Sequence, residues 1–297
     1  MTPIDGYFFY LVRLMDELRQ GDKKKQEKWV DELKEWPFWR AVIAEFMATF
    51  LFIFISTMSA VDMDTTVDPS AKYVKVGLTF GIMIAVGIQM IGHVSGGHIN
   101  PAVSLAMAVA RQISPLRAVF YVLAQLSGGM CGSLLLKGVT PSRFNDNLGL
   151  TAVNSELNAG QAFACELVYT FILVVSVFGC TDPNRALLGS PALSIGFTVA
   201  ALHFASIPFT GAGFNPARSF AVSVVSNSFE HHWVYWVGPM VGSVAAALAY
   251  KFVLCPYKST STYPEVAAKI IQSGEVSKHQ PQLKHGNDKM TLADISV

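Results

Sequence analysis

The tripeptide Asn-Pro-Ala occurs twice in this sequence, as Asn100, Pro101 and Ala102 and again as Asn215, Pro216 and Ala217. Asn is a strong helix N-cap and Pro is favoured at the first helical position, so each copy predicts a short helix, over 101–110 and 216–225. Each Asn would cap its own helix with its side-chain oxygen, which leaves its NH2 group free to donate. If the two helix ends met, a water molecule offering its oxygen to both donors would have to turn its hydrogens outward. That orientation interrupts the hydrogen-bond chain a proton needs, and the positive helix ends repel cations.

The elements that must hold these two motifs are apolar. Hydrophobic residues make up 52% of the 297 residues and charged residues only 14%, against about 25% charged in a soluble domain. Six apolar runs reach the roughly 20 residues that a helix needs to cross a bilayer: 38–60, 73–92, 117–137, 160–180, 189–209 and 233–254. The motifs lie between them, in shorter stretches at 93–110 and 210–226 that contain Gly and Pro. The sequence therefore predicts an all-α membrane protein with six transmembrane helices and two re-entrant half-helices.

The chain also consists of two related halves, about 37–140 and 158–256. The second Asn-Pro-Ala follows the first after 115 residues. Other residues recur in step, with Glu45, Thr49 and Phe50 matched by Glu166, Thr170 and Phe171. Three spans in each half would invert the second half relative to the first, so that the half-helices enter from opposite faces and meet near the midplane. Interrupted segments at matching positions of two halves indicate the pathway of a membrane protein.

A glycine-rich approach precedes each motif, formed by Gly96, Gly97 and His98 in the first half and by Gly211, Ala212 and Gly213 in the second. Irregular backbone survives at membrane depth only where it lines a cavity or is packed in protein. We expect these approaches to present successive carbonyl oxygens to a polar solute, although tight turns alone would also explain the glycines. Glu45 and Glu166 are ionisable groups inside apolar spans. We expect them to accept hydrogen bonds from the two approaches, with a proton relay as the alternative.

Arg218 directly follows the second motif, where a cation is costly unless it faces water or a partner. We expect it to project into the outer half of the pathway, with a structural salt bridge as the alternative.

These motifs, with Ser95 before the first approach and Ser219 after Arg218, resemble those of the aquaporin (major intrinsic protein) family over about 37–256. The resemblance implies an hourglass fold, a homotetramer and one pore through each protomer. It also implies a selectivity filter made of Phe80, His203, Ala212 and Arg218, in which His203 and Arg218 supply donors. By residue type alone, Phe80 and His203 would more often be core residues. Many relatives are blocked by mercury at a cysteine where this chain has Ala212, and the four cysteines of the chain are expected to be packing residues.

We therefore expect a passive water-selective channel, driven by osmotic gradients, that excludes protons and ions. A glycerol facilitator of the same family is the nearest alternative; such members carry Asp in place of Ser219 and a small residue in place of His203. Ser223, where relatives often have Ala, departs from the water-selective pattern. A secondary transporter and an ion-conducting or adhesion member of the family are further alternatives. We find no nucleophile–base pair, phosphate loop or metal cluster in the sequence, so we expect no enzyme, no metal and no cofactor.

The channel domain is expected to cover 37–256, between two cytosolic tails. Residues 8–35, most of the N-terminal tail 1–36, have the pattern of an amphipathic helix, with a frayed tail as the alternative. Residues 257–297 are polar and are expected to be disordered. Lys and Arg in the loops predict that both termini are cytosolic, and we expect a multi-pass protein of the plasma membrane. Its partners would be water and lipid, and a net charge of +1 gives no reason to expect nucleic acid. The segment 111–114 resembles a basic kinase site, a pattern that also arises by chance.

Overall fold

The structure, a computed structural model, describes residues 29–63, 66, 68–145, 147–182 and 189–255. The predicted C-terminal tail and the first 28 residues of the predicted N-terminal tail lie outside these described residues. Residues Trp29–Lys34 form a short 3-10 helix, η1. Its Glu32 pairs with Arg117 at 3.0 Å, so this part of the predicted tail is joined to the helical bundle.

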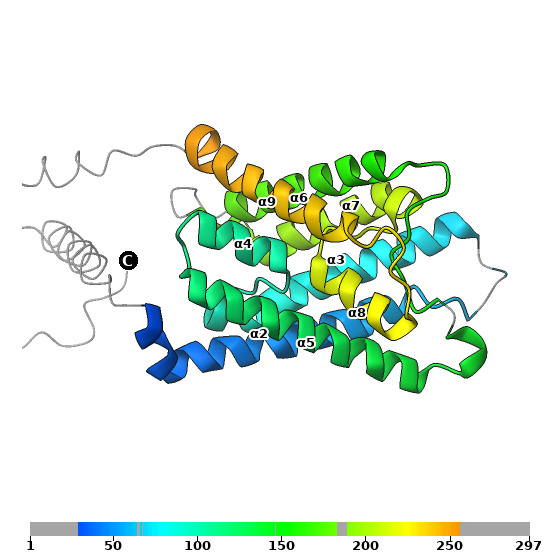
Figure 1. Cartoon of the computed structure of the whole chain (residues 1–297), viewed down its shortest axis with the longest axis horizontal. Helices are drawn as coiled ribbons and strands as arrows, with labels where there is room; N and C mark the ends of the chain where they lie inside the picture. The colour runs from blue at the N-terminus through cyan, green and yellow to red at the C-terminus, as the bar shows by residue number, and fades with distance from the viewer. Residues whose placement is uncertain (1–28, 64–65, 67, 146, 183–188, 256–297) are drawn as a thin grey trace, which may run out of the picture. The chain divides into compact units, whose positions relative to one another are not determined.

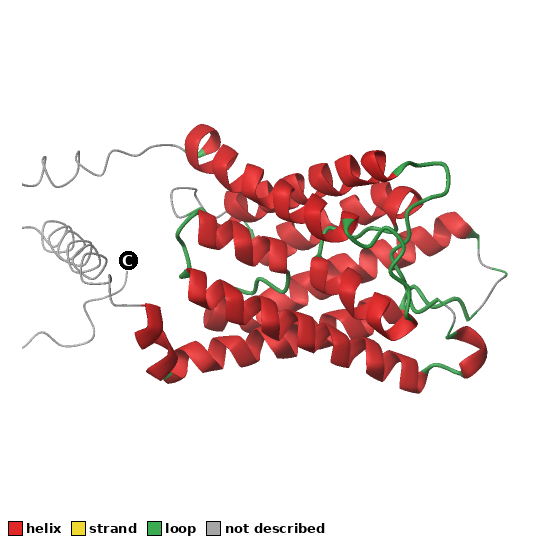
Figure 2. Ribbon diagram, viewed as in Figure 1, coloured by secondary structure: helices red, strands yellow, loops and turns green. Residues whose placement is uncertain are grey.

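The described residues form an all-helical bundle (Figures 1 and 2). The long helices are α2 (Trp36–Met58), α3 (Pro69–Ser95), α5 (Pro115–Val139), α6 (Ala159–Thr181), α7 (Pro191–Thr210) and α9 (Val234–Ala249), which continues as the π-helical segment η3 (Tyr250–Leu254). Two short helices, α4 (Pro101–Val109) and α8 (Pro216–Ser226), begin at the Asn-Pro-Ala motifs, and a 3-10 turn, η2 (Ser142–Phe144), follows α5. The predicted six spans and two half-helices are confirmed, with ends that differ by a few residues.

Local sequence explains where several of these helices begin. Asp68, Ser114 and Ser190 each precede a proline, and the side chain of each accepts a hydrogen bond from a backbone N–H in the first turn. A side-chain acceptor followed by Pro at the first helical position is a strong start signal, because that N–H has no partner within the helix. The length of the long helices follows from their apolar runs. Six of the described helices are long and apolar enough to cross a membrane.

The helices pack in pairs, both within each half of the chain and between the two halves. Helix α3 packs on α7, α2 on α5 and α6 on α9, while the half-helices α4 and α8 both contact α5 and α9. Where α3 crosses α7, a Cβ added to Gly196 would lie 2.5 Å from the carbonyl oxygen of Gly81. Glycine at this crossing therefore lets the two backbones approach closely, as small residues do in membrane bundles.

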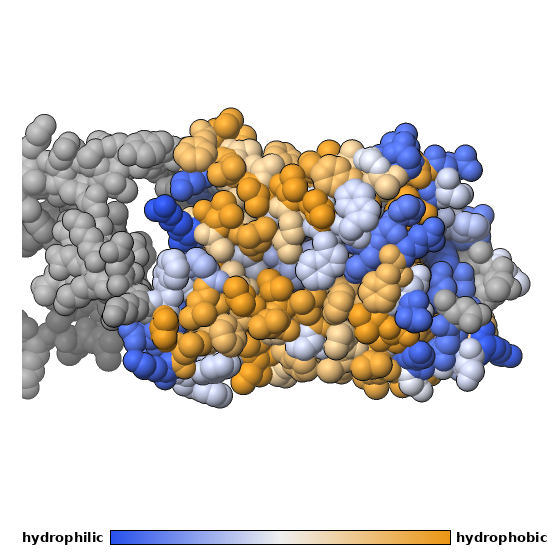
Figure 3. Space-filling view, viewed as in Figure 1, coloured by the Kyte–Doolittle hydropathy of each residue, from blue (hydrophilic) through white to orange (hydrophobic). Residues whose placement is uncertain are grey.

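Large apolar side chains cover the outside of the bundle. Phe197 on α7 is 69% exposed and Ile82 on α3 is 59% exposed, and Figure 3 shows hydrophobic residues over most of the visible face between more hydrophilic ends. Such exposure would be unfavourable in water, but it suits contact with lipid or with another membrane helix. Several buried polar side chains belong to the two half-helices and their capping residues, among them Asn100, Ser104, Asn215 and Ser219.

Candidate pore

The N-termini of the two half-helices meet through their capping asparagines. Asn100 Oδ1 accepts a hydrogen bond from Ala102 N at 2.9 Å, and Asn215 Oδ1 accepts one from Ala217 N at 3.0 Å. Their amide nitrogens cross to the opposite half, since Asn100 Nδ2 donates to the carbonyl oxygen of Phe214 at 3.0 Å. Each NH2 group was predicted to be free, but one of its two hydrogens is used across the loops. The second hydrogen is left for a solute.

In the first half, Glu45 holds the approach to α4. The carboxylate of this fully buried residue accepts hydrogen bonds from His98 N at 2.9 Å and Ile99 N at 2.7 Å. It also accepts a bond from the Ser95 hydroxyl at 2.7 Å, while the Tyr121 hydroxyl donates to the Ser95 carbonyl at 2.9 Å. An irregular stretch of backbone inside the bundle thereby finds the partners that a regular helix would provide.

The second half repeats this arrangement around the fully buried Glu166. Its carboxylate accepts hydrogen bonds from Gly213 N at 3.0 Å and Phe214 N at 2.5 Å, and from the Thr210 hydroxyl at 2.6 Å. The Tyr235 hydroxyl donates to the Thr210 carbonyl at 2.8 Å. The roles of Ser95, Thr210, Tyr121 and Tyr235 were not predicted, although Ser95 and Thr210 are 115 residues apart, as the two Asn-Pro-Ala motifs are.

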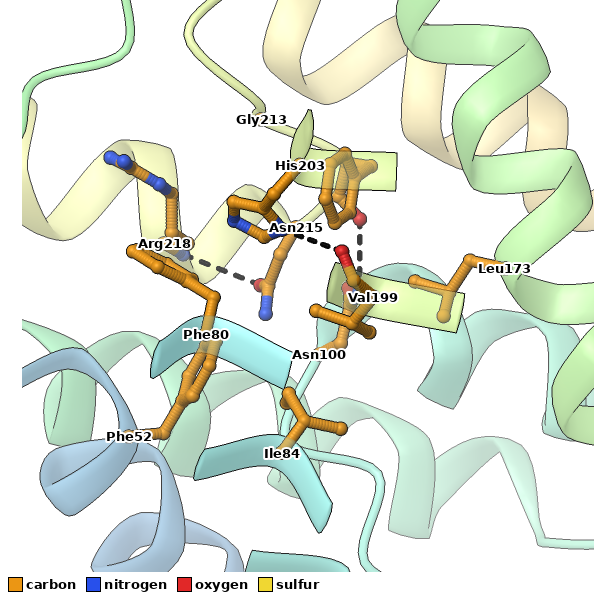
Figure 4. A pocket seen from close by; sticks show the side chains of 11 residues that line it. Phe52, Phe80, Ile84, Asn100, Leu173, Val199, His203, Gly213, Asn215 and Arg218 are labelled. Carbon is orange, nitrogen blue, oxygen red and sulfur yellow. Dashed lines mark hydrogen bonds between the residues drawn. The ribbon is translucent and has the colours of Figure 1, made fainter. Parts of the chain in front are cut away.

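A narrow cavity lies beside the meeting point of the half-helices. It is lined by Phe52, Phe80, Ile84, Asn100, Leu173, Val199, His203, Gly213, Phe214, Asn215 and Arg218. It offers about 20 Å³ to the centre of a water-sized sphere, and roughly 10–15 Å³ of such space is enough to hold one water molecule. Its walls come from α2, α3, α6, α7 and α8, and the two capping asparagines are among its lining residues (Figure 4).

Phe80, His203 and Arg218 come together at one end of this cavity. The rings of Phe80 and His203 are 4.3 Å apart, and the Arg218 guanidinium carbon lies 5.2 Å from the centre of the Phe80 ring. Arg218 is 3% exposed, and its Nη1 donates to the carbonyl oxygen of Gly149 at 2.5 Å. The partner of this buried cation is thus a backbone carbonyl in the loop between α5 and α6, while the Nε atom of Arg218 is fully buried and has no partner among the described residues.

The hydrogen-bonding role of His203 differs from the donor role that was predicted for it. Its Nδ1 lies 2.9 Å from the carbonyl oxygen of Val199, and a carbonyl can only accept, so Nδ1 carries the hydrogen. In a neutral ring Nε2 then offers a lone pair, and this buried atom has no partner among the described residues. For any group that reached it, Nε2 of neutral His203 would therefore be an acceptor and not the predicted donor, but this atom is fully buried in the structure.

Several predicted site residues do not wall the cavity. Ala212 is fully buried, and of its approach only Gly213 and the following Phe214 are lining residues. Gly96, Gly97 and Gly211 adopt left-handed φ angles of 94°, 67° and 70°, so they are needed first to turn the backbone. The aliphatic and aromatic lining residues Phe52, Ile84, Leu173 and Val199 were not predicted, because nothing local separates them from other apolar residues of their helices.

Comparisons with known proteins agree with this architecture. Residues 32–250 match the major intrinsic protein family. The chain is 43% identical over 268 residues to aquaporin-1 of Bos taurus, a match that covers 88% of this chain and 98% of the relative. It is 46% identical over 226 residues to aquaporin-2 of Ovis aries, covering 76% and 82%. A similar solved structure is the aquaglyceroporin from Plasmodium falciparum, with a TM-score of 0.68 and 25% identity, covering 74% of this chain and 98% of that one. The chain is thus a multi-pass membrane protein that belongs to the major intrinsic protein family.

Proposed function

We propose that this protein is a passive channel, selective for water and driven by osmotic gradients. The observation that carries the proposal is the narrow cavity between the ring of Phe80, His203 and Arg218 and the paired Asn100 and Asn215. It has room for a water molecule but little more, and its lining includes the polar side chains of Asn100, His203, Asn215 and Arg218. Family membership and the relatives named aquaporin-1 and aquaporin-2 support a channel rather than an enzyme.

Water would be selected by size and by hydrogen bonding at the constriction that Phe80, His203 and Arg218 form. Phe80 supplies an apolar wall, Arg218 a donor, and neutral His203 an acceptor, so a water molecule can use both its oxygen and a hydrogen. A glycerol molecule needs more width, because its carbon backbone must pass between Phe80 and the two polar side chains. The likeness to an aquaglyceroporin keeps a glycerol facilitator as the second candidate, and the bulk of His203 beside Phe80 argues against it.

Protons and cations would be excluded where the half-helices meet. The N-termini of α4 and α8 place the positive ends of two helix dipoles beside the cavity. The remaining amide hydrogens of Asn100 and Asn215 would hold the oxygen of a passing water and turn its hydrogens away. Arg218 adds a fixed positive charge on the same pathway, and aquaporin-type pores are a known case of exclusion by such charges.

The setting of the channel is part of the proposal. The Lys and Arg residues in the loops favour cytosolic termini. The exposed apolar faces of the bundle suit contact with lipid and with the other subunits of a homotetramer. We place the channel in the plasma membrane, with a channel domain over 37–256.

The test is an osmotic step on proteoliposomes that contain the full chain. Light scattering should report fast shrinkage in sucrose, with recovery in glycerol no faster than in protein-free vesicles. Equal rates for glycerol and water would favour the facilitator. Absence of any acceleration over empty vesicles, with the protein shown to be folded and inserted, would reject a channel for water.

A further inference from the structure

His98 takes part in a hydrogen-bond relay that begins at Glu45. The Glu45 carboxylate accepts hydrogen bonds from the backbone nitrogens of His98 and Ile99, and Gln125 Nε2 lies 2.8 Å from Oε2 of the same carboxylate. Backbone N–H groups can only donate, so these carboxylate oxygens act as acceptors here. The side-chain amide of Gln125 must therefore turn its NH2 group, and not its oxygen, towards Glu45.

The same NH2 group also donates to the Ser104 hydroxyl oxygen, and the Ser104 hydroxyl in turn donates to His98. Gln125 Nε2 lies 3.0 Å from Ser104 Oγ, and Ser104 Oγ lies 3.1 Å from His98 Nδ1. Since the Ser104 oxygen accepts from Gln125, its own hydrogen points to His98 Nδ1, its acceptor among the described contacts. An Nδ1 that accepts carries no hydrogen, so neutral His98 carries its hydrogen on Nε2.

The Nε2 atom of His98 is free to meet a solute. It has no hydrogen-bond partner among the described residues, and it is not among the described polar atoms that are fully buried without a partner. The side chain as a whole is 8% exposed, and its ring packs edge-on against Tyr121 at 5.2 Å. His98 thus presents one accessible N–H group, on the α4 side of the paired asparagines.

The second half of the chain also has a buried glutamate that bonds the approach to its half-helix, but it lacks the Gln–Ser–His relay. At the repeat spacing, Gly213 stands where the first half has His98, and Ser219 stands where it has Ser104. The Ser219 hydroxyl is buried and has no partner among the described residues. Because Glu166 holds the second approach without any such relay, the Gln125–Ser104 contact is not a requirement for building a half-helix.

We infer that Ser104 and Gln125 are positioning residues, which hold His98 in the tautomer that donates from Nε2 to water in the pathway. This inference rests on the proposed water channel. His98 would then bind the oxygen of a water molecule, as we propose for the NH2 groups of Asn100 and Asn215. The opposite tautomer would offer a lone pair instead. The bound water would then have to donate a hydrogen to His98, and its orientation would be reversed.

The tautomer can be measured without any transport. Solid-state NMR of 15N-histidine-labelled protein in lipid should give His98 a bare Nδ1 and a protonated Nε2, with the signals assigned by their loss in His98→Asn. Ser104→Ala should shift His98 towards a protonated Nδ1, whereas Ser219→Ala, which deletes the same buried hydroxyl from the other half, should not. A protonated Nδ1 in the wild type overturns the inference, whatever the variants do.

Water flux then tests the consequence. Ser104→Ala should lower the osmotic permeability per inserted channel about two- to tenfold, the range expected for one lost hydrogen bond, with Ser219→Ala close to the wild type. Equal permeability of the two variants would overturn the role in transport. A wild type that passes no water would instead reject the proposed function while leaving the NMR result standing, so the two failures are distinct.

Discussion

The side-chain nitrogen Nδ2 of Asn215 lies 3.0 Å from the carbonyl oxygen of Ile99, the residue that precedes the other capping asparagine. The reciprocal bond runs from Asn100 to Phe214. Two loops more than 100 residues apart in the chain are thereby tied together at the point where their half-helices begin. Each asparagine therefore caps its helix, bonds the opposite loop and keeps one hydrogen for a solute.

Asn215→Asp should increase cation conductance. Aspartate can still cap α8, but it loses the NH2 group and puts carboxylate oxygens opposite the carbonyl oxygen of Ile99. An ionised side chain would also offset the positive helix ends. Current under voltage clamp should rise above that of wild-type channels at matched surface expression. Unchanged current in a well-inserted variant would contradict the account of ion exclusion.

His203→Gly combined with Phe80→Ala should admit glycerol or urea while still passing water. The two substitutions remove facing walls of the ring, and Asn100 and Asn215 are untouched. Vesicle swelling in glycerol should accelerate at least severalfold over the wild type at matched insertion. If the well-inserted double variant excludes glycerol, Phe80 and His203 are packing residues and the proposed ring is wrong.

Glu166→Gln should destabilise the protein, because the new NH2 group faces the backbone and hydroxyl donors that now bond the carboxylate. Hydrogen bonds to a charged group contribute roughly 1.5–3 kcal/mol each, so we expect the thermal midpoint in detergent to fall by on the order of 5 °C. Glu156→Gln, on an exposed loop residue, is the matched control and should change little. Equal midpoints for the two variants would show that Glu166 is not a structural acceptor.

Mercurials should change water permeability less than about twofold. None of the four cysteines Cys131, Cys165, Cys180 and Cys255 lines the cavity, and Ala212 occupies the position of the reactive cysteine of relatives. The measurement is vesicle shrinkage before and after treatment, with Ala212→Cys as a probe of whether that position meets the pathway. Strong block that disappears in Cys180→Ser or Cys131→Ser alone would contradict this prediction.

Acid should weaken the start of α9 through His232. Trp236 Nε1 donates to His232 Nε2 at 3.0 Å, a contact that needs an unprotonated Nε2, and Ser223 Oγ lies 3.2 Å from Nδ1. Burial lowers the pKa of His232 below its ordinary value of 6.5. The unfolded chain then binds the proton more readily than the folded one, so this contribution to stability is complete above about pH 6.5 and is lost as the pH falls towards the folded pKa.

The thermal midpoint should therefore fall more between about pH 7.5 and pH 5.5 in the wild type than in His232→Gln, which cannot titrate. His231→Gln removes an exposed neighbouring histidine and should keep the wild-type dependence. A pH dependence that is the same in all three proteins would show that His232 does not titrate in this range.

The sequence alone determined the spans and the half-helices, because both depend on groups that are near one another in the chain. An apolar run needs no partner to become a membrane helix, and the side-chain oxygen of Asn100 reaches a backbone nitrogen only two residues away. The same local patterns occur in both halves, and these identified the paired asparagines and the paired glutamates.

Only the tertiary structure decided which atoms meet in the pathway. The partner of Arg218 is a carbonyl 69 residues away, and the amide of Asn100 bonds a residue 114 positions later. Phe52 and Leu173 became lining residues because of how α2 and α6 cross the bundle, and no local pattern separates them from other apolar residues. The direction in which His203 and His98 donate depends on single contacts of their ring nitrogens, and such contacts exist only once the helices have packed.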